Sequence, residues 1–216
     1  MSNQEAAEGV IQFAYTLERP QGPALEPEAF ADLSAWRSIL QSLSLLGQDP
    51  DRYEGAGFGN MSLRDGEAFV VTASQTGGEP TLDGEMLTRV THCNVERFWV
   101  EAEGTQPPSS ESVTHGMIYA ADPRLKCVFH VHSPELWGAR EALHLPQTNA
   151  DVGYGSPQMS TAVATLLNEN QSRPIVFATA GHEDGIFSCA ANPRDCGGLL
   201  VTYLAKARAQ ASLANA

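Results

Sequence analysis

The sequence has no apolar run near the ~20 residues that a membrane-spanning helix needs, and its opening MSNQEAAEGV has no basic stretch before an apolar block. We therefore expect no membrane span, no secretory signal and a cytoplasmic location. Basic clusters are missing too, because 13 scattered Lys and Arg face 26 Asp and Glu, for a net charge of −13. Nucleic-acid binding needs clustered cations, so we expect no such partner.

Paired cysteines and known phosphate-binding glycine motifs are also absent. No C-x-x-C pair occurs, so no structural zinc site is indicated, and we interpret the cysteines as buried free thiols. They are Cys93, Cys127, Cys189 and Cys196. The chain contains no Walker loop and no dinucleotide-binding G-x-G-x-x-G.

The sequence does contain alternating helix and strand patterns over most of its 216 residues. Apolar spacing predicts helices at 26–46, from 109 onward, and at 134–143, 156–167 and 193–209. It predicts strands at 61–63, 68–73, 87–102, 125–131, 174–179 and 186–189. Residues 1–24 lack a sustained period and are interpreted as an irregular N-terminal arm. Residues 25–216 form one expected α/β domain with a partly antiparallel sheet.

Two histidines end the strand in CVFHVHS, residues 127–133. Residues i and i+2 of a strand share a face, so His130 and His132 project together and could bind one metal ion. His182, in the turn AGHEDG after another buried strand, is the best third ligand, with His92, His115 and His144 as other options. Two histidines on an exposed strand face would be the ordinary alternative.

A carboxylate precedes this strand, in PPSSESVTHGMIY. We expect Glu111 in the first turn of a helix that Ser109 or Ser110 caps. Free amides at a helix start bind anions, although Glu there can simply favour the helix dipole. His115 could orient the carboxylate or just be packed. The turns GFGN (57–60) and TASQTGG (72–78) could present amides to an anion, or be plain turns.

Six segments in this order resemble the class II aldolase/adducin family, over about Glu28 to Ala207. They are GNMSLR, VVTASQTGG, PPSSESVTHGMIY, VFHVHS, DVGYGSPQM and AGHEDGIF. The resemblance implies a three-layer α/β/α sandwich with a mixed, largely antiparallel sheet, usually in a homotetramer. It implies that His130, His132 and His182 bind the metal and that Glu111 is the catalytic carboxylate. The residues implied to hold a substrate phosphate are Gly59, Asn60, Thr76, Gly77, Ser109 and Ser110.

The sequence departs from the family pattern at three places. The second loop, TASQTGG, lacks the family's proline and is longer, so the ligand could be a different anion. Glu183 and Asp184 follow the third histidine in place of glycine, and they could tighten cation binding, repel an anionic substrate or form a solvated turn. The aldolases use a late tyrosine from a neighbouring subunit, but Tyr203 lies in an apolar helix and is expected to pack.

We therefore expect a divalent-metal-dependent lyase acting on a small hydroxy-carbonyl compound, first of all a sugar phosphate, by aldol cleavage. The metal, zinc first with iron, cobalt, manganese or nickel also suited to three imidazoles, would stabilise an enediolate while Glu111 moves the proton. An epimerase, dehydratase or decarboxylase would use the same device. A non-catalytic adducin-like binding module is the alternative from a different class.

Overall fold

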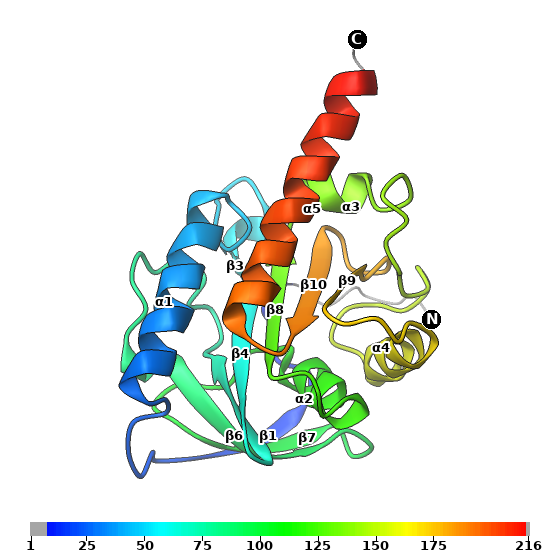
Figure 1. Cartoon of the computed structure of the whole chain (residues 1–216). Helices are drawn as coiled ribbons and strands as arrows, with labels where there is room; N and C mark the ends of the chain where they lie inside the picture. Colours follow the sequence, from blue (N-terminus) through cyan, green and yellow to red (C-terminus); the bar gives the residue numbers. More distant parts are fainter. Residues whose placement is uncertain (1–7, 215–216) are drawn as a thin grey trace.

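A computed structural model describes residues 8–214 of the chain. Positions 1–7 of the predicted arm and 215–216 of the predicted domain lie outside the described residues. The main sheet has eight strands in the order β1-β7-β6-β5-β4-β8-β10-β9, antiparallel except for the parallel pair β1 and β7 (Figure 1). The predicted α/β class with a mixed, largely antiparallel sheet is therefore confirmed.

The strands of the main sheet are β1 (Ala14–Glu18), β4 (Asn60–Asp65), β5 (Ala68–Thr72), β6 (Leu87–Asn94), β7 (Trp99–Glu103), β8 (Cys127–His132), β9 (Ile175–Ala178) and β10 (Gly185–Ala190). A small second sheet pairs β2 (Gly47–Gln48) with β3 (Gly57–Phe58). The helices are α1 (Pro27–Ser42), α2 (Ser112–Ala121), α3 (Pro134–Gly138), α4 (Pro157–Glu169) and α5 (Pro193–Ala214). No helix formed by residues 8–214 combines the length and apolar character needed to cross a membrane.

The helices cover the two faces of the sheet in separate layers. Leu33 and Leu40 of α1, Leu136 of α3 and Leu200 of α5 join one buried apolar cluster, which packs on one face. The helices α2 and α4 pack on each other and belong to the second cluster, on the opposite face. The α/β/α sandwich follows from these two cores, and Figure 1 shows the sheet between the helices.

Strand β8 lies inside the sheet, between β4 and β10, and is buried along its whole length. Its alternate residues Cys127, Phe129 and Val131 enter the α1/α5 core, so His130 and His132 face the α2/α4 side. Asn60, the first residue of β4, lies opposite His130, and Gly185, the first residue of β10, lies opposite His132. The histidines therefore stand where three neighbouring strands end or begin.

Several predicted elements differ from the structure. Residues 14–18 form β1, so the interpretation of residues 1–24 as irregular is wrong there; an edge strand paired on one side needs no strong apolar period. The predicted β region at 87–102 is a hairpin of β6 and β7. The helix expected at 134–143 ends at Gly138, whereas the last helix continues past 209 to Ala214.

The start of α2 is also corrected. Neither Ser109 nor Ser110 caps the helix; the capping position belongs to Glu111, whose backbone φ of −104° and ψ of 12° are not helical. The Ser109 Oγ instead accepts a hydrogen bond from the Glu111 amide, at 3.3 Å. Glu111 thus stands just before the helix, with its side chain free to point away from the helix start.

Candidate metal centre

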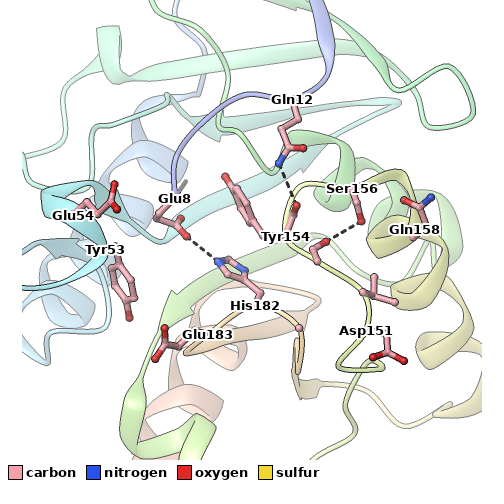
Figure 2. Close-up of a pocket in the computed structure, with 13 residues that line it drawn as sticks. Glu8, Gln12, Tyr53, Glu54, Asp151, Tyr154, Ser156, Gln158, His182 and Glu183 are labelled. Atoms are coloured by element: carbon pink, nitrogen blue, oxygen red, sulfur yellow. Dashed lines mark hydrogen bonds and ion pairs between the residues drawn. The ribbon is translucent and has the colours of Figure 1, made fainter. Parts of the chain in front are cut away.

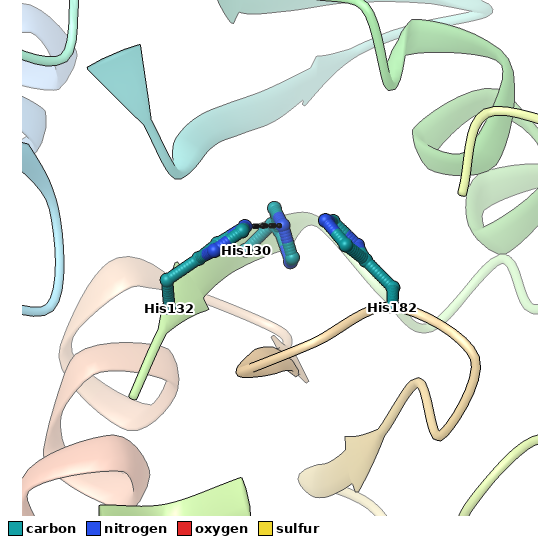
Figure 3. A group of neighbouring side chains, drawn as sticks. All are labelled: His130, His132 and His182. Atoms are coloured by element: carbon teal, nitrogen blue, oxygen red, sulfur yellow. Dashed lines mark hydrogen bonds between the residues drawn. The ribbon is translucent and has the colours of Figure 1, made fainter. Parts of the chain in front are cut away.

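Three imidazoles from two distant chain segments converge at the end of β8. His130 and His132 come from the strand, and His182 comes from the turn between β9 and β10 (Figure 3). One ring nitrogen from each lies within 4.8 Å of the others, and all three residues are buried. Nitrogen ligands of one tetrahedral zinc ion lie about 3.4 Å apart, so the cluster is close to the size of one metal site.

The hydrogen bonding of His130 gives a physical test of that fit. Its Nδ1 lies 3.2 Å from the Ile186 carbonyl oxygen, which can only accept, so the proton of a neutral ring belongs on Nδ1. Its Nε2 then turns a lone pair toward Glu111 Oε2 at 2.8 Å and His132 Nε2 at 3.1 Å. These groups repel one another unless a proton or a cation lies between them. The donor set fits a divalent cation.

The turn that carries His182 is fixed by its own backbone. The His182 amide donates to the Thr179 carbonyl and the Gly185 amide donates to the His182 carbonyl, each at 3.0 Å. Thr179 Oγ1 also donates to the Gly185 carbonyl, at 3.1 Å. These bonds close the turn between two paired strands, so the imidazole is held at the edge of the cluster.

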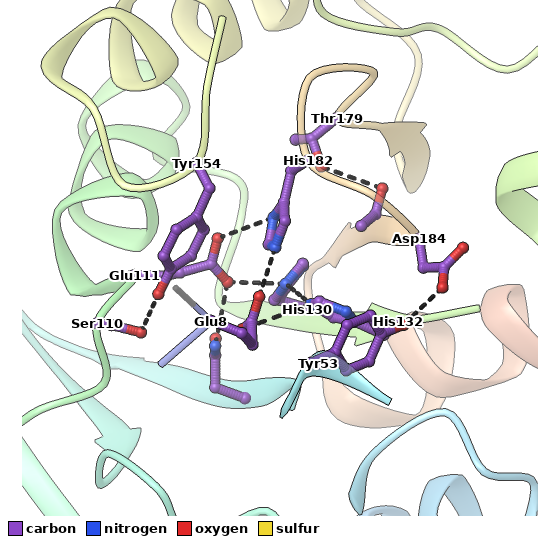
Figure 4. Close-up of polar contacts among 12 residues, drawn as sticks. Glu8, Tyr53, Ser110, Glu111, His130, His132, Tyr154, Thr179, His182 and Asp184 are labelled. Carbon is purple, nitrogen blue, oxygen red and sulfur yellow. Dashed lines mark hydrogen bonds and ion pairs between the residues drawn. The ribbon is translucent and has the colours of Figure 1, made fainter. Parts of the chain in front are cut away.

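Two carboxylates flank the imidazoles (Figure 4). Glu111 approaches from the α2 side, where the Asn60 Nδ2 donates to its Oε2 at 3.1 Å. Glu8 approaches from the N-terminal segment, with Oε2 2.8 Å from His182 Nε2 and Oε1 3.7 Å from His132 Nε2. Three imidazole nitrogens therefore form the compact cluster, and a carboxylate lies against it on each of two sides.

Electrostatics at the centre favour an ionised Glu111 carboxylate and a neutral His132, whereas His182 is shifted toward its charged form. Burial alone would raise the pKa of the Glu111 carboxyl, but the charge and hydrogen bond of His130 outweigh it and lower the pKa to about 2. Burial holds the pKa of His132 well below its ordinary value, with the neighbouring histidines adding to the effect. For His182, burial lowers the pKa, but the Glu8 hydrogen bond and the charges of Glu111, Glu8 and Asp184 together outweigh burial and raise it.

The His115 side chain does not hydrogen-bond the Glu111 carboxylate. Its Nδ1 lies 2.6 Å from Ser62 Oγ, which also lies 2.7 Å from the Tyr119 hydroxyl, in the core beneath Glu111. Burial lowers the pKa of His115 to about 3, so the ring is neutral. The packed alternative holds for this residue, and His92 and His144 are exposed and outside the cluster.

The residues implied to hold a phosphate gather beside the metal cluster. A crevice of only about 10 Å³, room for about one water molecule, is lined by Gly59, Asn60, Gly77, Ser109 and Ser110, together with Glu8 and Gly9. Thr76 lies in a neighbouring crevice of the same size.

Hydrogen bonds within the protein already engage the hydroxyls of Ser110 and Thr76. The Tyr154 hydroxyl donates to Ser110 Oγ, and Thr76 Oγ1 donates to the Ala73 carbonyl at 2.8 Å. The buried Arg37 guanidinium donates to the Thr76 carbonyl at 2.6 Å, which fixes the 72–78 loop. As it stands, the crevice is closed to a phosphate.

A larger cavity opens on the other side of the imidazoles. It has a volume of about 730 Å³ and is lined by Glu8, Tyr53, Tyr154, His182 and Glu183, among others (Figure 2). Tyr154 and Tyr53 flank it, with ring centres 4.5 Å from His182 and 4.7 Å from His132. Burial and the charges of Glu111 and Glu8 raise the pKa of the Tyr154 hydroxyl, which therefore stays protonated.

The two acids after His182 have different surroundings. Glu183 is exposed at the cavity wall. Asp184 is buried, and its Oδ2 accepts from the Tyr53 hydroxyl at 2.6 Å and lies 3.9 Å from Arg52. The solvated alternative thus holds for Glu183 only, while Asp184 fixes Tyr53 beside His132.

Sequence reasoning missed Glu8, Tyr53 and Tyr154. Tyr154 lies inside the DVGYGSPQM segment that carries the resemblance, which was a usable signal. Glu8 lies in the segment interpreted as an arm, and nothing in its neighbours marks it. Tyr203 packs against the α1/α5 core as expected. All four cysteines are free; three are buried, while Cys93 is half-buried.

Most of the chain matches a protein-family model. Residues 50–203 match the model described as Class II Aldolase and Adducin N-terminal domain. This stretch includes the three histidines, Glu111 and Tyr154. A search of curated proteins found no match.

Solved structures of low sequence identity share the fold. The l-fuculose-1-phosphate aldolase from Thermus thermophilus is 18% identical, with a TM-score of 0.64 over 87% of this chain and 94% of that chain. YgbL from Klebsiella pneumoniae, for which aldolase, epimerase or decarboxylase activity has been suggested, is 17% identical, with a TM-score of 0.66 over 87% and 90%. A sugar-phosphate aldolase from Thermotoga maritima is 15% identical, with a TM-score of 0.61 over 86% and 96%.

Proposed function

Because the chain belongs to the class II aldolase and adducin family, we propose that it is a divalent-metal-dependent lyase that cleaves a small hydroxy-carbonyl compound, first of all a sugar phosphate. The observation that carries the proposal is the contact of His130 Nε2 with both a carboxylate and a second imidazole. His130, His132 and His182 would hold the cation, with zinc first. When bound, the cation supplies Lewis-acid polarisation of the substrate carbonyl and stabilises the negative charge that forms there.

The carboxylate and the tyrosine would handle protons. Glu111 is ionised at neutral pH, and Asn60 holds its Oε2 beside the imidazoles, so it is placed to accept a proton from the substrate. The Tyr154 hydroxyl keeps its proton at the cavity wall and is placed to return one.

Epimerisation, dehydration and decarboxylation would need the same residues. Identifying the reaction products therefore distinguishes these activities from aldol cleavage. An adducin-like module without activity would need no carboxylate fixed beside three metal-binding imidazoles. The full donor set therefore favours an enzyme. The family's phosphate residues line a closed crevice here, so whether the substrate carries a phosphate is the finer question for experiment.

The test begins with the metal content of the purified protein, measured by mass spectrometry for zinc, iron, cobalt, manganese and nickel. Matched phosphorylated and unphosphorylated hydroxy-carbonyl compounds are then screened, with both carbonyl fragments quantified. We expect Glu111→Gln to keep the cation and lose about 10²–10⁴-fold in turnover. A protein that takes up no divalent cation, or a Glu111→Gln variant with full activity, overturns the proposal.

A further inference from the structure

The carboxylate of Glu8 occupies the open side of the histidine cluster. Its two oxygens lie 2.8 Å from His182 Nε2 and 3.7 Å from His132 Nε2, while Glu111 covers His130 from the opposite side. Its side chain is 11% exposed, so an acid near the chain start is enclosed at the centre. A carboxylate that is mostly removed from water, beside two buried imidazoles, is costly unless a cation or a proton offsets its charge.

The segment that carries Glu8 is fixed in place by contacts of its own. The Gly9 carbonyl accepts from Ser74 Oγ at 3.3 Å, and Gln12 Nε2 donates to the Tyr154 carbonyl at 3.2 Å. Gly9 has a φ of +74°, which turns the chain at that point, and a Cβ there would meet the Gln75 side chain at 1.7 Å. We call residues 8–12 the N-terminal strap.

The strap lies across the place where a substrate must enter. Glu8 and Gln12 line the cavity of about 730 Å³ on one side, and Glu8 and Gly9 close the crevice of the 57–60 and 72–78 loops on the other. Figure 2 shows Glu8 between the strap and His182, pointing at the imidazole. A ligand that reaches both the imidazoles and the two loops has to take the position of the Glu8 carboxylate.

We propose that Glu8 is an internal ligand of the metal ion, and that a substrate binds by displacing its carboxylate and the strap. This inference rests on the proposed function. Oxygen donors from carboxylates bind divalent cations alongside imidazoles, and Glu8 supplies one from a segment held by hydrogen bonds to Ser74 and Tyr154. The strap closes the centre when no substrate is present, and its displacement opens the crevice that the family's phosphate residues line.

The test measures cation binding and displacement separately. Metal-free wild type, Glu8→Gln and Glu8→Ala are titrated with Co²⁺ against a chromophoric chelator, and their visible spectra are recorded. The Co²⁺ proteins are then titrated with acetohydroxamate, a bidentate oxygen ligand shaped like a chelating hydroxy-carbonyl group. Glu54→Gln is the matched control, because it removes one charge from the same cavity wall, where Glu54 is exposed.

We expect both Glu8 variants to bind Co²⁺ about 10-fold or more weakly, with an altered visible spectrum. We expect them to bind acetohydroxamate about 10-fold more tightly. This factor results if the wild-type conformation that can bind the ligand, with the Glu8 carboxylate displaced, is only about a tenth populated. Glu54→Gln should match wild type in both titrations. Unchanged Co²⁺ affinity, or unchanged hydroxamate affinity, in both Glu8 variants overturns this inference.

The two proposals fail in different ways. If wild type binds no Co²⁺, the metal centre itself is wrong and both proposals fall. If wild type binds Co²⁺ and His132→Ala does not, the metal centre stands and the Glu8 titrations decide the strap alone. Thermal unfolding of each metal-free variant shows that it is folded before any binding is compared.

Discussion

The two ends of strand β8 differ in whether their buried polar groups have hydrogen-bond partners. At the histidine end, residues 130–132, His132 Nδ1 is buried without a hydrogen-bond partner, and imidazole nitrogens face each other at 3.1 Å. At the cysteine end, the turn at 122–125 leads into the strand and its polar groups are paired. Unsatisfied polar groups cost stability, so the unpaired nitrogen and the facing imidazoles at this end indicate a place that a ligand completes.

The cysteine end shows what full pairing looks like in the same protein. Asp122 accepts from Arg124 and from Arg173 Nε, both at 2.8 Å on Oδ2, and the Arg173 guanidinium also donates to backbone carbonyls of the 167–172 stretch. Arg64 donates to the Leu125 carbonyl at 3.0 Å across the adjacent strand. One strand thus carries a stabilising end and an end whose polar groups are arranged for binding.

The largest effect on the difference between the two ends is expected when a histidine of the cluster is replaced by an apolar residue. His132→Leu has nearly the same volume, so we expect metal-free stability to stay level or rise by about 1–2 kcal/mol as the unpaired Nδ1 is removed. Cation affinity should fall more than about 100-fold, since one of three ligands is lost. Urea unfolding of chelator-treated protein and Co²⁺ titration measure the two effects.

His92→Leu is the control, because His92 is exposed on β6 and lies outside the cluster. It should change neither cation binding nor, by more than about 0.5 kcal/mol, stability. A metal-free His132→Leu protein destabilised by more than about 2 kcal/mol would mean that the ring is needed for packing, and the contrast between the ends would be lost.

Removing a charge at the cysteine end, by Asp122→Asn, should lower stability and leave cation binding unchanged. The hydrogen bond of Arg124 to Asp122 lowers the pKa of that carboxyl to about 2, from an ordinary 3.8, and Arg173 adds to the shift. A folded-state pKa below the unfolded one gives stability that is present above pH ~4 and is lost as the pH falls toward 2. Asp122→Asn should therefore cost about 1–2 kcal/mol at pH 7.

Denaturant unfolding of both proteins from pH 7 down to 2 checks this prediction. The difference in unfolding free energy should shrink steadily below pH ~4, while Co²⁺ affinity at pH 7 stays the same. A difference that persists undiminished at the acid end would show that Asp122 acts by packing and not by its charge.

The central strands could be predicted from sequence because the patterns that indicate them lie within a few neighbouring residues. The H-x-H pattern places two imidazoles on one strand face, and a buried strand before His182 puts that turn at the same end of the sheet. The strand register then fixes how close the rings come, and sequence alone does not give that register. The convergence was thus expected, while the contacts of His130 with Glu111 and Ile186 were not.

The edges of the molecule were less predictable. Strand β1 has a mostly exposed pattern and gains its structure from pairing with β7, a contact about 85 residues away in sequence that no local signal encodes. Glu8 reaches His182 across 174 positions of sequence, and its neighbours Ala7 and Gly9 give no periodic pattern. Such a contact depends on tertiary structure, which overrides what short windows of sequence can indicate.

The smallest expected effect lies between the two ends, on the neighbouring strand β10. Ser188 is fully buried opposite Phe129, and its hydroxyl donates to the Cys196 carbonyl at 2.8 Å. Ser188→Ala removes one satisfied neutral hydrogen bond, so we expect a loss of about 1 kcal/mol in unfolding free energy. Because Gly185 of the same strand pairs with His132, a change in Co²⁺ affinity would show that strain passes along β10 to the imidazoles. Unchanged Co²⁺ affinity beside a measurable loss of stability would show that the two ends of β8 act independently, as distant sites do.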